Sequence, residues 1–190
     1  MKCCRKELNN PGIIDGTAYF VCTECGELRE VKGYCVYSTE DSFDYFKDKY
    51  GFDLPEEYIL FQAIEHGSVF EFPASDNESI NYYFGEGFYT TGNIANVNPN
   101  ADYSIYDSAS SGWEWGLPKN HIAIEGDGHA WLALDYSGST VSPSVVVVET
   151  DGGNSLKVAE SLGELVARLL RYEDVYDTDG NIIYHRKNAW

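Results

Sequence analysis

Two segments near residue 50 place apolar side chains at helical spacing. The first helix is expected over 39–50, where Ser38 or Thr39 can cap its start because a hydroxyl accepts a backbone N–H that the first turn leaves free. The second helix is expected over 55–66, because the missing N–H of Pro55 costs nothing at a helix start. Their apolar faces consist of Phe43, Phe46, Tyr50, Tyr58, Phe61 and Ile64.

From residue 68 onward the pattern changes to short apolar runs separated by turns. Strands are expected at 68–72, 79–84, 87–91, 121–125, 129–137 and 144–149. The last of these is a run of valines without polar alternation, which is typical of a strand buried on both faces. The segment 92–116 is rich in Asn, Ser, Asp and Gly, and we expect a long irregular loop there. An amphipathic helix over 161–173 and a hairpin over 175–186 complete this part of the chain.

The stretch EGDGHAWLALDYS, residues 125–137, gathers four polar side chains: Glu125, Asp127, His129 and Asp135. Asp127-Gly128 favours a tight hairpin turn, whose central residues need positive φ. Strand alternation places His129 and Asp135 on one face but about 20 Å apart, too far to share a proton or a metal. Glu125 and His129 could approach across the hairpin, with no third partner visible. We therefore expect a structural hairpin and no catalytic residues, with a hydrolase that uses carboxylates near Asp127 and His129 as the alternative.

All five cysteines lie before residue 38 and indicate a small β-rich appendage over 1–38, followed by an acidic main domain over 39–190. A Cys-x-x-Cys pair can grip one zinc ion, and a structural site needs four ligands. The expected zinc ligands are Cys3, Cys4, Cys22 and Cys25, with Cys35 as a spare. Adjacent cysteines point in different directions, so cysteines without metal are the alternative, whereas disulfides are not expected in the cytosol.

The formal net charge of −18 belongs to the main domain. Residues 1–38 hold five acids and five bases, which leaves 26 acids and 8 bases in 39–190. Between Lys49 and Lys119 there are eleven acids and no Lys or Arg. Such a field repels nucleic acid and attracts basic surfaces, although solubility alone would also account for it. No apolar leader or bilayer-length run occurs, so we expect a cytoplasmic protein that binds neither nucleic acid nor a membrane.

Several short motifs follow one another along the main domain. They are Leu54-Pro55 before Tyr58, the Gly126–Gly128 turn, the strand end Leu134-Asp135, Pro143 with Val145, and the helical run Ser161–Leu170. In this order the segment 39–172 resembles the SUKH superfamily, which includes the yeast Smi/Knr cell-wall regulators and many bacterial immunity proteins.

The resemblance implies an α+β fold, a single SUKH-like domain whose largely antiparallel sheet is flanked by helices. It also implies a non-enzymatic protein that binds and neutralises a cognate polymorphic toxin, such as a nuclease, and it offers no catalytic residues. A regulatory scaffold, as in the yeast relatives, is the alternative role. The cysteine-bearing appendage departs from the family pattern.

The expected loop over 92–116 lies within the stretch that lacks Lys and Arg, and we expect the partner, a basic protein toxin, to bind there. Loops of this length are usually functional, acids can pair with basic residues, and Tyr and Trp are common interface anchors. The alternative is that Trp113 and Trp115 are core residues that cap the sheet. The expected partner-binding residues are Asp102, Tyr103, Tyr106, Asp107, Trp113, Glu114 and Trp115.

We predict that the purified protein contains zinc, held by the cysteines of the appendage. Metal binding should supply folding energy to a segment that is too short to form its own core. Elemental analysis checks this. A purified protein with no detectable zinc, in which all thiols react freely, would show that the cysteines hold no metal.

Overall fold

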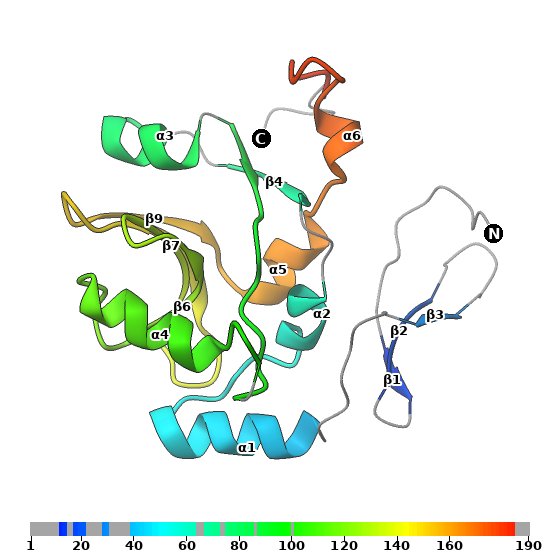
Figure 1. Ribbon diagram of the computed structural model, residues 1–190, viewed down its shortest axis with the longest axis vertical. Helices are drawn as coiled ribbons and strands as arrows, with labels where there is room; N and C mark the ends of the chain where they lie inside the picture. Colours follow the sequence, from blue (N-terminus) through cyan, green and yellow to red (C-terminus); the bar gives the residue numbers. More distant parts are fainter. Residues whose placement is uncertain are drawn as a thin grey trace.

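The computed structural model describes residues 12–14, 17–21, 28–30, 39–63, 67–72, 75–85, 87–99 and 101–184. In the appendage, three strands form an antiparallel sheet in the order β1-β2-β3, drawn beside the main body in Figure 1. They are β1 (Gly12–Ile14), β2 (Thr17–Val21) and β3 (Leu28–Glu30). The four expected zinc ligands, Cys3, Cys4, Cys22 and Cys25, lie outside the described residues.

A four-stranded antiparallel meander forms the centre of the main body (Figure 1). Its strands are β6 (His121–Gly126), β7 (Ala130–Asp135), β8 (Ser144–Glu149) and β9 (Asn154–Ala159). Leu132 and Leu134 of β7 face the main core, whereas Trp131 and Ala133 belong to a second apolar cluster on the other face. The expected alternation along 129–137 and the expected burial of the valine strand on both faces are confirmed.

Helices and a small second sheet surround this meander (Figure 1). The helices that contribute to the main core are α1 (Thr39–Tyr50), α2 (Tyr58–Gln62), α3 (Glu78–Phe84), α4 (Ile105–Glu114) and α5 (Leu162–Ala167). The small sheet pairs β4 (Val69–Glu71) with β5 (Phe88–Thr90), and α6 (Tyr172–Val175) follows α5. The α+β class with antiparallel sheets and flanking helices is as expected.

The strand expected at 79–84 is wrong, because these residues form α3. The side chain of Asn77 accepts hydrogen bonds from the backbone N–H groups of Ser79 (3.0 Å) and Ile80 (3.1 Å) and so caps the helix. Ile80 and Phe84, four residues apart, are buried on the same helical face. The tyrosines between them favour a strand by composition, but the cap and the spacing of the buried residues decide for a helix.

The irregular loop expected over 92–116 is also wrong in its second half, which forms α4. Ser104 caps this helix: its Oγ accepts from the Asp107 N–H at 3.1 Å and donates to Asp107 Oδ2 at 2.6 Å. Ile105, Ala109 and Gly112 recur at helical spacing and are buried. Small and polar residues between them hid this periodicity.

Smaller differences concern element lengths. The strand β9 was not expected, and α2 and α5 are shorter than the helices expected over 55–66 and 161–173. In the part of the expected tail hairpin that the structure describes, up to Tyr184, Tyr176 and Ile182 form an antiparallel bridge. None of the helices in the described part of the chain has the length and apolar character needed to cross a membrane.

The helix α4 lies along the edge strand β6. The close approach requires Gly112, because a Cβ there would lie 2.6 Å from Leu117 Cδ1 and 2.9 Å from Ala123 Cβ. A covered edge strand cannot pair with another chain. The glycine therefore fixes the position of α4 on the sheet.

We predict that Gly112→Ala lowers the free energy of unfolding by about 1–3 kcal/mol, because the added methyl group overpacks the contact with Leu117 and Ala123. Ser110→Ala, on the exposed side of α4, is the matched control and should change stability by less than about 0.5 kcal/mol. Urea denaturation measures both. A Gly112→Ala protein as stable as the parent would show that α4 can move away from β6 without cost.

Candidate functional site: a pocket around Glu125

A β-bulge in β6 turns the side chain of Glu125 towards the main core. Ala123 pairs with Ala133, but the next pair is Glu125 with Leu132, so Ile124 is an extra residue in the strand. Without the bulge, strict alternation would place Glu125 on the opposite face from Leu132. Instead Glu125 shares the face of Leu132 and is only 7% exposed.

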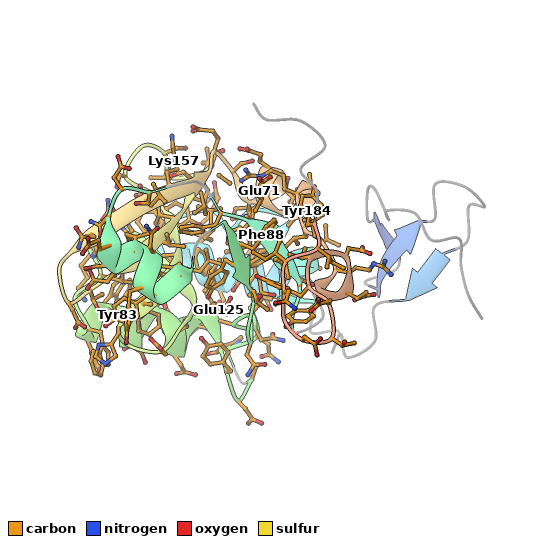
Figure 2. All side chains as sticks on the ribbon, turned by 90° about the horizontal axis from the view of Figure 1, so that it is seen from above. Glu71, Tyr83, Phe88, Glu125, Lys157 and Tyr184 are labelled. Atoms are coloured by element: carbon orange, nitrogen blue, oxygen red, sulfur yellow. The ribbon has the colours of Figure 1, made fainter. Side chains whose placement is uncertain are left out.

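Glu125 lines a pocket of about 420 Å³ between α3, β5, the segment before α4 and the end of β6. Figure 2 shows Glu125 in the interior of the main body and Tyr83 nearer its edge. The pocket is lined by Tyr83, Phe84, Tyr89, Gly92, Asn93, Tyr103, Glu125, Gly126, Asp127 and Ala130. Four of these described residues are aromatic, two carry carboxylates, and none is Lys or Arg.

The two oxygens of the Glu125 carboxyl differ in their surroundings. Oε1 accepts a hydrogen bond from the backbone N–H of Gly92, and a Cβ on Gly92 would lie 2.8 Å from that oxygen. The backbone N–H of Ala95 donates to Ile124 O at 2.8 Å and holds this segment along β6. Oε2 is buried and has no hydrogen-bond partner among the described residues.

Burial raises the pKa of Glu125 to about 7, and the Gly92 N–H and the neighbouring Tyr89 hydroxyl act in the opposite direction. Burial also raises the pKa of Tyr89 and of Tyr103, so both hydroxyls stay neutral at physiological pH. The pocket therefore holds one carboxyl group poised between its two protonation states and neutral phenols around it. Such perturbed groups in a cavity are typical of functional sites.

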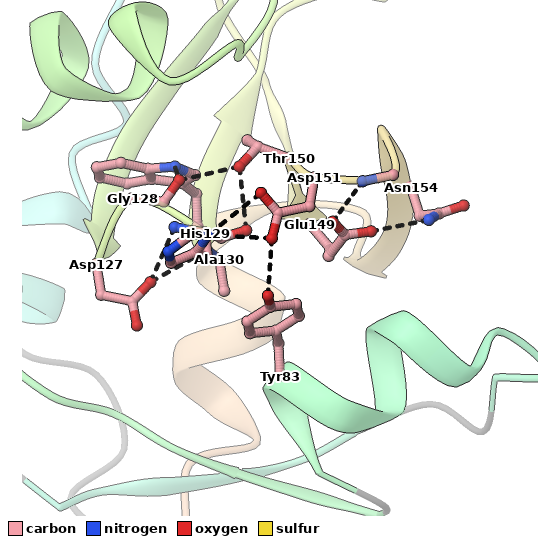
Figure 3. A network of polar contacts seen from close by, with 11 residues as sticks. Tyr83, Asp127, Gly128, His129, Ala130, Glu149, Thr150, Asp151 and Asn154 are labelled. Atoms are coloured by element: carbon pink, nitrogen blue, oxygen red, sulfur yellow. Dashed lines mark hydrogen bonds and ion pairs between the residues drawn. The ribbon is translucent and has the colours of Figure 1, made fainter.

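Beside the pocket, a polar network connects α3 with two hairpin turns (Figure 3). Asp151 accepts from the Tyr83 hydroxyl at 2.9 Å and contacts His129 Nδ1 at 3.0 Å. These hydrogen bonds lower the pKa of Asp151, and the one from Tyr83 has the larger effect. The network ties the turn after β8 to the turn after β6 and to α3.

The expected hairpin turn at Asp127-Gly128 is present, and it comprises the three residues Asp127 to His129. Asp127 Oδ1 accepts from the N–H groups of His129 and Ala130, both at 3.1 Å, which is the usual role of Asp in a turn. Gly128 takes positive φ, at 105°, as a tight turn requires.

The polar residues of 125–137 do not converge on one catalytic arrangement. Glu125 hydrogen bonds Gly92, whereas His129 pairs with Asp151, and the two side chains face different partners. An oriented Asp–His pair needs a nucleophile on the other ring nitrogen. Among the described residues, no Ser, Thr or Cys side chain hydrogen bonds the His129 ring, and no group of three or more side chains could hold a metal ion.

An exposed aromatic row passes the network. We use this name for Tyr82, Tyr83, His129 and Trp115, whose successive ring centroids are 5.0, 6.2 and 5.3 Å apart. Tyr82 is 82% and Trp115 51% exposed. Trp115 also packs on the turn after β6, since a Cβ on Gly128 would lie 3.1 Å from its indole. The row and the pocket share Tyr83.

The expected partner-binding residues are divided by the structure into two groups. Tyr106 is in the core, 5% exposed, and its hydroxyl donates to Ser42 O at 3.4 Å. Trp113 is partly buried and its Nε1 donates to His121 O at 2.8 Å, as the core alternative describes. Asp107 is exposed but holds the N-terminus of α4 through Ser104.

The remaining expected residues stay near the pocket and the aromatic row. Tyr103 lines the pocket, and Asp102 next to it is exposed. Trp115 is in the aromatic row, and Glu114 next to it is exposed. Tyr83 and Asp151 are missed by the sequence analysis: Tyr83 lies in a segment expected to be a strand, and the signal at Asp151 is only an acidic side chain in a turn-like segment.

Comparison with known proteins gives one finding. Residues 37–168 match the model of the SMI1 / KNR4 family (SUKH-1). No curated protein and no solved structure matches the chain. The matched range contains Glu125, the aromatic row and Asp151.

We predict that Glu125→Gln makes the folded protein less sensitive to alkaline pH. Folding raises the pKa of this carboxyl from 4.5 to about 7, so the folded state binds the proton more tightly than the unfolded state does. The carboxyl therefore does not destabilise the folded protein at low pH. It lowers the free energy of unfolding increasingly as the pH rises from 4.5 to about 7, and by a constant amount above that. The stability of Glu125→Gln relative to the parent should therefore rise by about 3 kcal/mol between pH 4.5 and pH 8. Chemical denaturation at several pH values measures this difference. A difference that does not change with pH would contradict the burial of a titrating carboxyl.

Proposed function

Because the chain belongs to the SMI1 / KNR4 family (SUKH-1), we propose that it is an immunity protein that binds and neutralises a cognate protein toxin with a basic surface. The family match over residues 37–168 is the observation that carries the proposal. The stretch without Lys and Arg between Lys49 and Lys119 supports the choice of a basic partner.

We place the interface at the aromatic row and the mouth of the Glu125 pocket. Exposed Tyr and Trp side chains are typical interface anchors, and exposed acids beside them steer a basic partner. Lys49 and Lys119 are not among the residues that line the pocket, and their ammonium groups lie over the rings of Tyr106 (4.8 Å) and Trp113 (4.4 Å).

Two other roles are the alternatives to this proposal. A hydrolase built on Asp127 and His129 would need a reacting group near the His129 ring, and the separate partners of Glu125 and His129 speak against it. A regulatory scaffold would use the same aromatic row for a different partner and would give no protection against a toxin. Protection therefore separates the proposed role from both alternatives.

The experiment is co-expression with the product of the adjacent upstream gene. We expect that product alone to stop growth, and growth to return when the chain is expressed with it. The chain and the toxin should also elute together as a complex in size-exclusion chromatography. A toxic upstream product that arrests growth equally with and without the chain would reject the proposal.

We predict that the double charge reversal Asp102→Lys and Glu114→Lys slows association with the toxin about tenfold or more at low salt, and weakens the salt dependence of the rate. Stability should change little, because both side chains are exposed. Asp179→Lys, in the turn after α6 at the other end of the body from α4 (Figure 1), is the matched control and should leave the rate nearly unchanged. The control changes the net charge by two and the double reversal changes it by four, so a slowing by the control about half as large on a logarithmic scale would mean that net charge alone, rather than this surface, steers the partner.

A further inference from the structure

We infer that the Glu125 pocket is a binding site for one cationic side chain, Arg or Lys, of the protein partner, and that Glu125 is its specificity-determining residue. This inference names a contact of the partner proposed above. The pocket itself can be tested without that partner.

The first argument is the unpaired oxygen. Glu125 lines the cavity and is only 7% exposed, and its buried Oε2 atom has no hydrogen-bond partner among the described residues. Buried polar atoms are nearly always paired, and an exception needs an explanation. A guanidinium or ammonium group from outside would supply the missing donors and a compensating charge.

The second argument is the sign of the surroundings. Among the described residues, Asp127 is the other charged side chain of the pocket lining, and none of the lining residues is Lys or Arg. An anionic ligand would meet two carboxyl groups, and an apolar ligand would leave Oε2 unpaired. Of these three kinds of ligand, a cation is the one that both carboxyl groups attract.

The third argument is the aromatic wall. The rings of Tyr83, Tyr89 and Tyr103 line the same cavity. Aromatic faces attract cations, and Arg in particular stacks on them. The volume of about 420 Å³ lies near the lower end of the range of about 300–1,000 Å³ for sites that hold small ligands, which suits a single long side chain.

The larger cavity of about 620 Å³ between α1 and the segment before α2 lacks these properties. The acid–base pair in its lining is already satisfied, because Lys47 Nζ lies 2.7 Å from Asp53 Oδ1. Among the described residues, no buried and unpaired carboxyl oxygen lies in that cavity. The inference is therefore specific to the Glu125 pocket.

The test uses propylguanidinium as the probe and propylurea as its uncharged analogue of the same shape. Both are titrated into the full chain at pH 8 and constant ionic strength, and amide chemical shifts are followed by NMR. We expect saturable shifts of the Gly92, Gly126 and Asp127 amides with propylguanidinium, in the millimolar range, and none with propylurea. Equal shifts with both compounds, or none with either, would overturn the inference.

Two variants sharpen the result. Glu125→Gln keeps the shape but removes the charge, and we expect at least a tenfold loss of probe affinity. Glu149→Gln is the matched control: Glu149 is a buried carboxylate outside the pocket, with oxygens bonded to Gly152 N (2.6 Å) and Asn154 Nδ2 (2.8 Å). It should bind the probe as the parent does. Unchanged probe binding by Glu125→Gln would overturn the inference. If a variant does not fold, the comparison of the two probes on the parent protein is the deciding test.

The toxin itself provides the last arm. If the parent protein rescues growth, Glu125→Gln should weaken toxin affinity about 30-fold or more, the usual effect of removing one partner of a buried charge pair. Rescue with unchanged affinity would reject the pocket contact and leave the proposed function standing. Probe binding without any rescue would reject the proposed function and leave the cation site standing.

Discussion

The bulge at Ile124 is the constraint on which the candidate site depends. It shifts the register of β6 by one residue, so that Glu125 joins Leu132 on the core side of the sheet. A buried carboxyl then needs donors, and the backbone of the segment after β5 supplies one through Gly92. That segment can approach so closely because Gly92 has no side chain; a Cβ at this position would collide with Oε1. The bulge, the glycine and the carboxyl are therefore a single structural unit.

The rest of the fold holds the walls of this unit in place. The helix α4 covers the edge of β6, where Gly112 permits close contact with Ala123. Across the pocket, Tyr83 fixes α3 to Asp151, and Asp151 fixes His129 in the turn after β6. An exposed polar contact of this kind adds little stability by itself. Here its consequence is geometric, because three separate elements are kept at fixed distances around one cavity.

Much of the fold could be predicted from the sequence, because the meander obeys local patterns: alternation in β7, unbroken valines in β8, and an Asp-Gly turn before His129. The two misassigned helices begin at Asn77 and Ser104, whose capping hydrogen bonds outweigh the strand-like and loop-like compositions that follow them. The pocket could not be predicted. A bulge leaves no residue signature in β6, and period-two alternation assigns Glu125 to the wrong face.

The unpaired oxygen of Glu125 also links binding to stability. Burying an ionised carboxyl without a counter-charge destabilises the folded state, and its pKa of about 7 expresses that penalty. A single Gly92 N–H and a nearby phenol reduce the penalty without removing it. A cation that enters the pocket stabilises the charged form, so any such ligand binds the folded protein in preference to the unfolded one and raises its stability. The feature that weakens the free protein is thus the one that would favour a basic partner over a neutral one.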